Sequence, residues 1–238
     1  MRSLLLSGAC AATMLLALTP SAEAADIGYA PPPGGSWYVS VFGGWSMGDE
    51  IEADFLGSQN VGWNLDADLD DGFTAGLAVG TQFGEWLRGE IEVSGNWHSA
   101  DGTLASTAST PEIDDVSGDV DALFLLANLW VEVPLGAGPF RPYAGGGVGI
   151  GRLDVDLDAA AAAGTASVVN DDDWAFAWQL GAGVAFDVSS NLAIDLGYRF
   201  KRIETVDLEG TSFFGATPPD IEVDYTSHNV VVGARLTF

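Results

Sequence analysis

The chain has 238 residues, of which 34 are Asp or Glu and 8 are Lys or Arg, so its formal net charge at pH 7 is −26. So few basic residues exclude a nucleic-acid-binding protein, because phosphate backbones are recognised by clustered Lys and Arg. Hydrophobic residues nevertheless make up 47% of the chain and glycine occurs 31 times, so apolar and acidic residues must be segregated along it.

Residues 1–24 predict a secretory signal peptide that is removed on export. Arg2 precedes an apolar run that ends near Leu18, and the small residues Ala22 and Ala24 mark a cleavage site after Ala24. The run is shorter than the roughly 20 apolar residues that a membrane-spanning helix needs. Cys10, the single cysteine, lies too early in the apolar run for a lipid-attachment site and leaves with the signal, so the mature chain is expected to lack disulfides.

Residues 25–35 are rich in Pro and Gly and predict an extended linker, and residues 36–238 predict one domain of β-strands. In the first strand segment, Trp37, Val39, Val41 and Trp45 share one face, and Ser40 lies on the other. This alternation with period two is typical of β-structure. It recurs in eight segments: 37–47, 73–83, 87–97, 120–133, 140–157, 176–187, 192–201 and 229–238. In 140–157 a glycine run leaves open which residues point inward.

No apolar run after residue 24 is long enough for a membrane-spanning helix, so a chain that crosses a membrane must do so with strands closed into a barrel. The connections alternate in length. Residues 84–85, 134–139 and 187–191 predict short turns, and residues 48–71, 98–118, 154–172 and 203–224 predict long loops. Short periplasmic turns and long extracellular loops are typical of outer-membrane barrels. We therefore predict an all-β, eight-stranded, antiparallel, up-and-down transmembrane β-barrel in the outer membrane of a Gram-negative bacterium.

Charged residues on the face that carries the glycines predict an ionic network inside the barrel. An eight-stranded barrel is just wide enough to be filled by side chains, and an unpaired buried ion costs several kcal/mol. The predicted interior residues are Arg88, Glu90, Glu92, Glu132, Arg141, Asp195, Arg199, Lys201 and Arg235. An alternative is that Glu90, Glu92 and Asp195 form a catalytic or proton-conducting cluster, but structural ion pairs are favoured.

Most other acids fall in the predicted long loops, where charge runs usually keep a surface hydrated. Clustered carboxylates are also ligands for divalent cations, which could bridge to lipopolysaccharide phosphates. The segment 66–72 is similar to a calcium-binding helix–loop–helix motif, but its Gly falls one place late and Leu77 occupies the position of the bidentate Glu. We reject that motif and predict no metal ligand and no cofactor.

His98 and His228 each have a serine neighbour, Ser99 and Ser227, as a lipid-modifying Ser–His hydrolase could require. Adjacent residues in a strand point to opposite faces, so neither pair can form readily, and both histidines are expected at the membrane interface. No nucleophile elbow or phosphate loop occurs. We predict no catalytic residue. A soluble periplasmic lipocalin-like barrel is a further alternative, but it would need apolar residues inside and charges outside.

The segments 37–44 (WYVSVFGG), 141–149 (RPYAGGGVG) and 230–238 together resemble the opacity-type outer-membrane β-barrel family, which is similar in architecture to the transmembrane domain of outer-membrane protein A. The resemblance implies eight strands and exposed loops, and a role as a structural surface protein, an adhesin or a host-factor binder. The acidic loops depart from the basic, heparin-binding surfaces of some members.

The chain ends in Gly233, Leu236 and Phe238, which resemble the signal that the barrel-assembly machinery recognises. The expected partners are that machinery, outer-membrane lipid and lipopolysaccharide. The predicted function is that of a non-enzymatic surface barrel that contributes to envelope structure or surface interaction.

Overall fold

The computed structural model describes residues 36–49, 51–56, 62–106, 113–133, 138–161, 164–209 and 220–238, and it describes side chains in these ranges except in 51–64, 104–115, 160–167 and 209–221. The predicted signal peptide with Cys10, Ala22 and Ala24, and the predicted linker 25–35, lie outside the described residues. In the part of the chain that the structure describes, no helix is long and apolar enough to span a bilayer.

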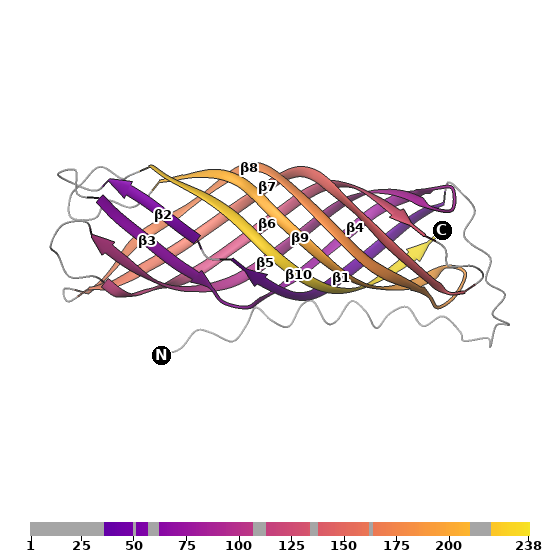
Figure 1. Ribbon diagram of the computed structural model, residues 1–238, viewed down its shortest axis with the longest axis horizontal. Coiled ribbons are helices and arrows are strands. Elements are labelled where there is room, and N and C mark those ends of the chain that lie inside the picture. The colour runs from indigo at the N-terminus through magenta and orange to yellow at the C-terminus, as the bar shows by residue number, and fades with distance from the viewer. Residues whose placement is uncertain are drawn as a thin grey trace.

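Ten β-strands are formed by the described residues (Figure 1). They are β1 (Trp37–Gly48), β2 (Ile51–Leu56), β3 (Gly62–Leu69), β4 (Gly72–Phe83), β5 (Leu87–Ser106), β6 (Ile113–Glu132), β7 (Phe140–Ala161), β8 (Gly164–Asp187), β9 (Leu192–Glu209) and β10 (Asp220–Thr237).

Eight of these strands close into a ring. The order β5–β4–β1–β10–β9–β8–β7–β6 is completed by pairing of β5 with β6, and every pairing is antiparallel. The ends of the chain seal the wall, because Tyr38 pairs with Thr237 and the Phe238 amide donates a hydrogen bond of 2.8 Å to the Trp37 carbonyl. Strands tilted around a common axis are plain in Figure 1. The predicted eight-stranded up-and-down barrel is confirmed.

The hairpin of β2 and β3 continues the wall beyond β1 and β4. β3 pairs with the far part of β5, with Leu69 opposite Ala100, and β2 pairs with β3 and ends the sheet. Figure 1 places this hairpin at the end of the barrel opposite the C-terminus. The described short turns 84–86 and 188–191, the first with Gly84 at φ of 74°, lie near the C-terminus, because Thr81 pairs with Trp37 and the Thr237 amide donates to the Asn191 carbonyl. We call this the short-turn end.

The predicted long loops are the main error of the sequence analysis. Much of 48–71, 98–118, 154–172 and 203–224 is strand, and the β7–β8 ladder continues to the pair of Ala161 with Gly164. The physical reason is visible in the sequence: Leu65, Ala67 and Leu69 alternate with acids, which is again period two but with the polarity reversed. An apolar residue at every second position gives these segments a core to bury, so they continue the barrel.

Outward side chains divide the barrel into two parts. The first, which we call the apolar belt, comprises 37–47, 73–83, 87–97, 123–133, 140–150, 174–186, 192–200 and 228–238. Its outward positions hold residues such as Trp37, Leu125 and Phe176, and within these ranges no Asp, Glu, Lys or Arg points outward. Each stretch is close to the roughly 9–11 residues that a tilted strand needs to cross a bilayer.

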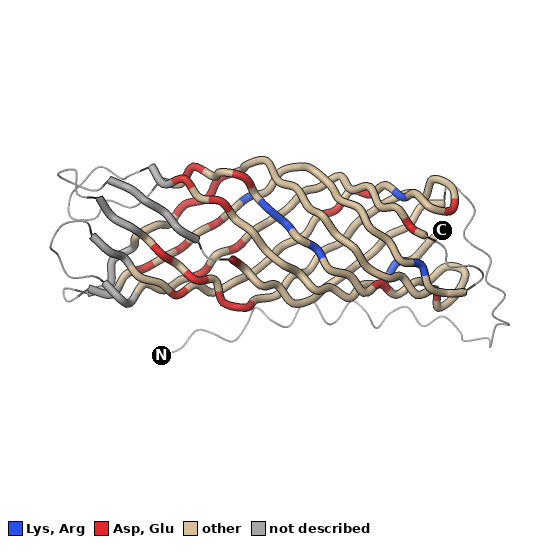
Figure 2. The backbone as a smooth tube through the Cα atoms, in the orientation of Figure 1, with Lys and Arg blue, Asp and Glu red and all other residues tan. Residues whose placement is uncertain are grey.

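The second part, which we call the extension, comprises 51–56, 62–71, 98–106, 113–122, 151–161, 164–173, 202–209 and 220–227. Among its described side chains, apolar residues point inward and form a core; examples are Leu65, Val120 and Leu157. Inward-facing residues of the adjoining apolar belt complete this core. Exposed acids such as Asp68 and Asp156 cover its outside. Figure 2 shows most acidic positions gathered in this half of the barrel, with fewer charged positions along the rest of it.

The same polarity resolves the parity of 140–157, which the sequence left open. Tyr143 and Leu153 are buried inside the barrel, and Phe140, Val148 and Ile150 are exposed on its outside. Odd-numbered residues of β7 therefore face inward from Arg141 to Ala159, and the glycines of the run at 145, 147 and 149 line the interior.

Candidate functional site

The barrel interior collects the charged side chains that the sequence predicted there. Eight of the nine predicted residues are buried, and the Asp195 side chain is the most open, with 17% exposed. Asp187, the last inward position of segment 176–187 and the first residue of the predicted turn, was not counted in the predicted network; it joins the network through Arg141. Among the described residues the interior thus holds five basic side chains, Arg88, Arg141, Arg199, Lys201 and Arg235, and five acidic ones, Glu90, Glu92, Glu132, Asp187 and Asp195. The formal charges balance.

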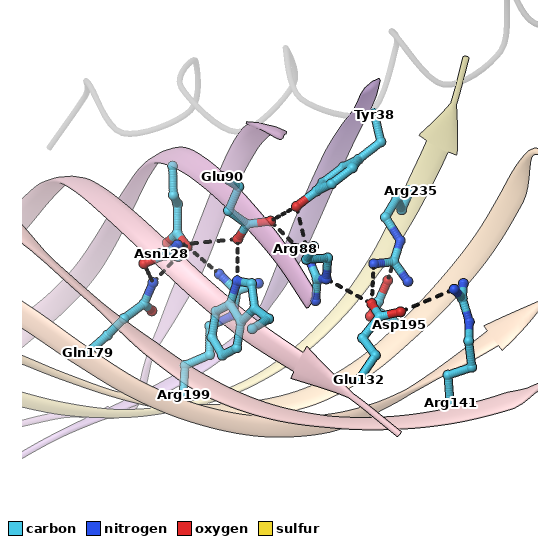
Figure 3. Close-up of polar contacts among 12 residues, drawn as sticks. Tyr38, Arg88, Glu90, Asn128, Glu132, Arg141, Gln179, Asp195, Arg199 and Arg235 are labelled. Atoms are coloured by element: carbon cyan, nitrogen blue, oxygen red, sulfur yellow. Dashed lines mark hydrogen bonds and ion pairs between the residues drawn. The ribbon is translucent and has the colours of Figure 1, made fainter. Parts of the chain in front are cut away.

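Glu132 of β6 organises the short-turn end of the interior (Figure 3). Its Oε1 accepts hydrogen bonds from Arg88 Nε at 2.8 Å and from Arg235 Nη1 at 2.6 Å, and its Oε2 lies 3.1 Å from Arg141 Nη1. Arg141 also pairs with Asp187. One carboxylate therefore ties together β5, β7 and β10 across the lumen. Charge-assisted bonds of this kind are about twice as strong as neutral ones.

Glu90 of β5 occupies the next level. It accepts hydrogen bonds from the Tyr38 hydroxyl at 2.7 Å, from Arg88 Nη1 at 2.9 Å and from the Trp130 indole at 2.8 Å. The Arg88 guanidinium lies 5.1 Å from the ring centre of Tyr143 and 5.6 Å from that of Trp130, within the range of cation–π attraction. Aromatic rings and ion pairs together fill the cross-section.

Glu92 is the centre of a third level. It accepts hydrogen bonds from Lys201 Nζ at 2.8 Å, from Arg199 Nη1 at 2.7 Å, from Asn128 at 2.8 Å and from Gln179 at 2.9 Å. These partners come from β6, β8 and β9. A buried carboxylate needs such partners, because an unpaired buried ion is costly. The contacts of Glu92 therefore agree with the favoured prediction that the interior charges form structural ion pairs.

Glycines make room for the side chains that cross the lumen. A Cβ atom on Gly147 would lie 1.8 Å from Asn128 Oδ1, and one on Gly183 would lie 2.6 Å from the Tyr143 hydroxyl. Both positions are therefore closed to any larger residue unless the network moves. The abundance of glycine on the inner face follows from this crowding.

Between the ionic interior and the apolar core lies a layer of neutral polar groups. Asn96 donates hydrogen bonds to the Tyr225 hydroxyl at 3.0 Å and to Ser227 Oγ at 2.8 Å. His98 belongs to this layer, since its Nδ1 lies 2.9 Å from the Asp70 carbonyl and its Nε2 lies 3.0 Å from Ser46 Oγ. The prediction that His98 lies at the membrane interface is wrong; the ring is 3% exposed and points inward.

The Ser46–His98 pair was missed by the sequence analysis, which tested only sequence neighbours. The carbonyl of Asp70 can only accept, so Nδ1 carries a proton, and in the neutral ring Nε2 then accepts from the Ser46 hydroxyl. A serine donating to a histidine is the arrangement of an activated nucleophile. Both residues are buried, however, with 0% and 3% exposed, so no substrate can reach the hydroxyl in this conformation. Ser46 and His98 both occupy inward-facing positions in the period-two alternation, and this pattern could have predicted that both point into the barrel.

His228 faces outward, as expected for a residue of the barrel's outer face. Its Nδ1 lies 2.5 Å from the Tyr198 hydroxyl, and its Nε2 lies 3.6 Å from Asp49 Oδ1. Among the described residues, no serine or cysteine is hydrogen-bonded to the His228 ring. The predicted assembly signal is in the last strand: Gly233 pairs with Phe42, Leu236 faces outward, and Phe238 is exposed at the short-turn end. Its recognition by the assembly machinery stays a prediction.

Carboxylates on the outside of the extension face one another across strands. Asp121 of β6 pairs with Asp154 of β7, which pairs with Asp172 of β8. Partial burial, together with Asp119 and Asp154, raises the pKa of Asp121, and a hydrogen bond from Arg152 lowers the pKa of Asp172. Among the described residues no three His, Asp or Glu side chains are placed to hold a metal ion. Segment 66–72, rejected above as a calcium motif, is mostly strand β3.

A closed ring with an apolar outer face and an ionic, filled interior defines an integral membrane β-barrel. This arrangement contradicts the soluble lipocalin-like alternative for the apolar belt, although the extension has the polarity of a soluble barrel. Residues 9–238 match the family described as outer membrane protein beta-barrel domain, and the chain belongs to this family. The protein is an outer-membrane β-barrel.

Comparisons with individual proteins agree with this assignment. An uncharacterized protein of Brucella suis biovar 1 is 26% identical over 194 residues, which cover 75% of this chain and 66%, just under two thirds, of the relative. Two solved structures share the fold. They are the outer membrane protein OprG from Pseudomonas aeruginosa, with 18% identity, a TM-score of 0.55 and coverage of 87% and 98% of the two chains, and the outer membrane protein AlkL, with 21%, 0.51, 93% and 97%.

Proposed function

We propose that the protein is a non-enzymatic, non-conducting surface barrel that carries a rigid acidic extension outside the outer membrane and contributes there to envelope structure or surface contact. The observation that supports this proposal most directly is the charge-balanced, buried interior. A pore needs water along its axis, whereas Trp130 and Glu92 are among the side chains that cross this lumen with almost no exposed surface. Eight-stranded barrels are normally filled in this way.

The extension supports the surface role. In outer-membrane barrels the short turns are periplasmic, which places the extension outside the cell. Its strands run about ten residues beyond the apolar belt, so it rises on the order of 25 Å above the membrane for a rise of about 3.3 Å per residue and a tilt of about 40°. An apolar core stiffens this part, and the acidic outside keeps it hydrated.

A lipid-modifying enzyme is the second candidate, and the Ser46–His98 pair is the observation that favours it. Burial of both residues argues against it, since lipid would have to enter the barrel through a wall of paired strands. Ser46→Ala separates the two roles. A surface barrel should keep its envelope phenotype in this variant, and a hydrolase should lose all activity toward outer-membrane lipid.

Conductance tests the proposal itself. The mature protein in planar bilayers should give no stepwise current, and Trp130→Ala/Tyr143→Ala, which removes two rings that cross the lumen, is the matched variant in which a passage is created. Stable steps from the unaltered protein would contradict the proposal. A shift in gel mobility between boiled and unboiled samples shows in each case that the barrel is folded.

Surface exposure is tested by labelling. Asp68→Cys on the outside of β3 should react with a membrane-impermeant maleimide on intact cells, because position 68 is exposed on the extension. Glu85→Cys, in the exposed turn after β4, is the matched control and should react only after the outer membrane is permeabilised. The reverse pattern would overturn the orientation.

A further inference from the structure

We propose that an outward patch on β7, β8 and β9, formed by Arg152, Trp174, Trp178 and Arg202, binds the phosphate of a lipopolysaccharide anchor in the outer leaflet. We call these four residues the boundary patch. The inference rests on the orientation proposed above, with the extension outside the cell, and it goes beyond that function because it assigns one lipid to one side of the barrel.

The first support is the distribution of basic residues. The described part of the chain contains seven basic residues, and five of them belong to the interior network. The two that remain, Arg152 and Arg202, both point outward, and each is the first charged outward residue beyond the apolar belt, following Ile150 on β7 and Phe200 on β9.

The opposite wall lacks this feature. There the first outward charged residues beyond the belt are acidic, namely Asp49 after β1, Asp101 on β5 and Asp121 on β6. Phosphates of the outer leaflet are anionic, and the outward positive charges that they can meet among the described residues are the two guanidinium groups on this side of the barrel. This uneven distribution of outward charges distinguishes one side of the barrel from the other, as binding of a particular lipid on that side would require.

The second support is the register that brings the four residues together. Arg152 is directly opposite Trp174, and Trp178 is directly opposite Arg202, with β8 between the two arginine-bearing strands. Trp174 is 47% exposed. Tryptophan is enriched at the level of lipid headgroups, where its ring meets acyl chains and its indole N–H meets polar groups. The patch therefore lies at the height of the headgroups.

The carboxylates around the patch hold each guanidinium in place. Arg152 Nε lies 2.7 Å from Asp172 and its Nη2 lies 3.4 Å from Asp154. All of these carboxylates lie on the extension side of the arginines, because 154 follows 152 along β7 and 172 precedes 174 along β8. The Arg152 ion pairs are therefore made toward the extension and not toward the belt.

Arg202 has the same arrangement on β9. Its Nη2 lies 2.7 Å from Asp224 and its Nε lies 3.3 Å from Glu204, whose Oε1 also accepts a hydrogen bond of 2.7 Å from the Trp178 indole. The side chains of Arg152 and Arg202 are 37% and 32% exposed. Exposed ion pairs contribute little free energy, so these carboxylates position the arginines without removing them from reach of a phosphate.

The chemistry of the patch selects a phosphorylated lipid. Guanidinium groups bind phosphate through their N–H donors, and the ion pairs to described residues use Nε and Nη2 of Arg152 and Arg202, which leaves their Nη1 groups for a phosphate. Phe176 lies between the two tryptophans on the outward face of β8 and Leu180 follows Trp178 toward the short-turn end; both are exposed on the apolar belt, where acyl chains attached to the phosphate would lie. A free anion in solution would gain only the first of these contacts, which favours the lipid.

The test compares two double variants of the mature protein in detergent micelles titrated with bisphosphorylated lipid A, with binding read by native mass spectrometry. Arg152→Gln/Arg202→Gln removes two positive charges from the patch. Ser99→Asp/Ser117→Asp adds two negative charges on the outward face of β5 and β6, which matches the change in net charge on the opposite wall. Gel mobility and conductance report folding and the sealed lumen independently.

We expect the arginine variant to bind at least about tenfold more weakly, the factor that corresponds to one charge-assisted hydrogen bond, and the serine variant to change less than about twofold. Fully dephosphorylated lipid A should bind the unaltered protein as weakly as lipid A binds the arginine variant. Equal losses in the two variants, equal binding of the dephosphorylated lipid, or displacement by inorganic phosphate alone would each overturn the proposal. None of these results would alter the conductance or labelling tests.

Discussion

Lys201 Nζ lies 2.8 Å from Glu92 Oε1 in the middle of the barrel, and neither side chain has any exposed surface. Breaking a buried pair leaves an uncompensated charge, so we expect Glu92→Gln and Lys201→Met each to lower the free energy of unfolding, by about 3–5 kcal/mol. Glu92→Gln/Lys201→Met removes one charge of each sign, so its cost should be smaller than the sum. Urea unfolding in lipid vesicles measures the cycle, and additive losses would show that the pair is not coupled.

Glu132 contacts three arginines, so its removal should cost more than that of any one partner. We expect Glu132→Gln to destabilise the barrel by about 3–5 kcal/mol, because Arg88, Arg141 and Arg235 then lose a shared carboxylate in a closed space. Glu85→Gln, in the exposed turn after β4, should change stability by less than about 0.5 kcal/mol. The temperature at which the gel mobility shifts on heating measures both. A larger effect of Glu85→Gln would refute this reading of the network.

Gly147 should tolerate no side chain. A Cβ atom there would lie 1.8 Å from Asn128 Oδ1 and 2.7 Å from the Ala127 carbonyl, so Gly147→Ala should cost about 1–3 kcal/mol. Gly43 faces outward, and its added Cβ would meet only the Thr74 carbonyl at 3.6 Å. Gly43→Ala is therefore the matched control and should be nearly neutral. Equal stability of the two variants in chemical unfolding would disprove the crowding argument.

Asp121 should make the extension sensitive to pH. Partial burial first, and then Asp119 and Asp154, raise its pKa above that in the unfolded chain, so its ionisation opposes folding. Stability from this group is fully present below the unfolded pKa near 3.8 and is lost as pH rises through that value and the raised folded value. Asp121→Asn should add about 0.2–1 kcal/mol at pH 7, the scale of a cross-strand pair, and nothing at pH 3. A gain that persists at pH 3 would contradict this origin.

His98 should fasten the base of the β2–β3 hairpin to the barrel, because it joins Ser46 of β1 to the carbonyl of Asp70 just after β3. His98→Leu leaves both partners without a bond and should cost about 1–3 kcal/mol. Amide hydrogen exchange should accelerate in 62–69 and stay unchanged in the β7–β8 ladder. His228→Leu, on the outer face, is the control. If the protection of amides 62–69 from hydrogen exchange were unchanged in His98→Leu, the His98 ring would not anchor the hairpin.

Alternation with period two was enough to predict the strands of the belt and their inner faces. Once Leu125 and Leu129 are assigned to lipid, Asn128 and Glu132 must point inward, because successive side chains of a strand alternate. The same alternation is present in the extension, but there the acid-rich segments were predicted to be loops. Asp154, Asp156 and Asp158 alternate with buried apolar residues, which is the signature of a strand with a dry interior and a wet exterior. Acid-rich composition suggested loops instead.

The sequence by itself determined that this protein is a closed membrane barrel with ions inside and apolar residues outside, since side-chain parity is a local property of the strand. Only the tertiary structure decided which ions meet. Glu132 and Arg235 are separated by 103 positions, and Ser46 and His98 by 52. Such pairs depend on the tilt and stagger of strands around the ring, which set the height of each residue along the axis and which no single strand encodes.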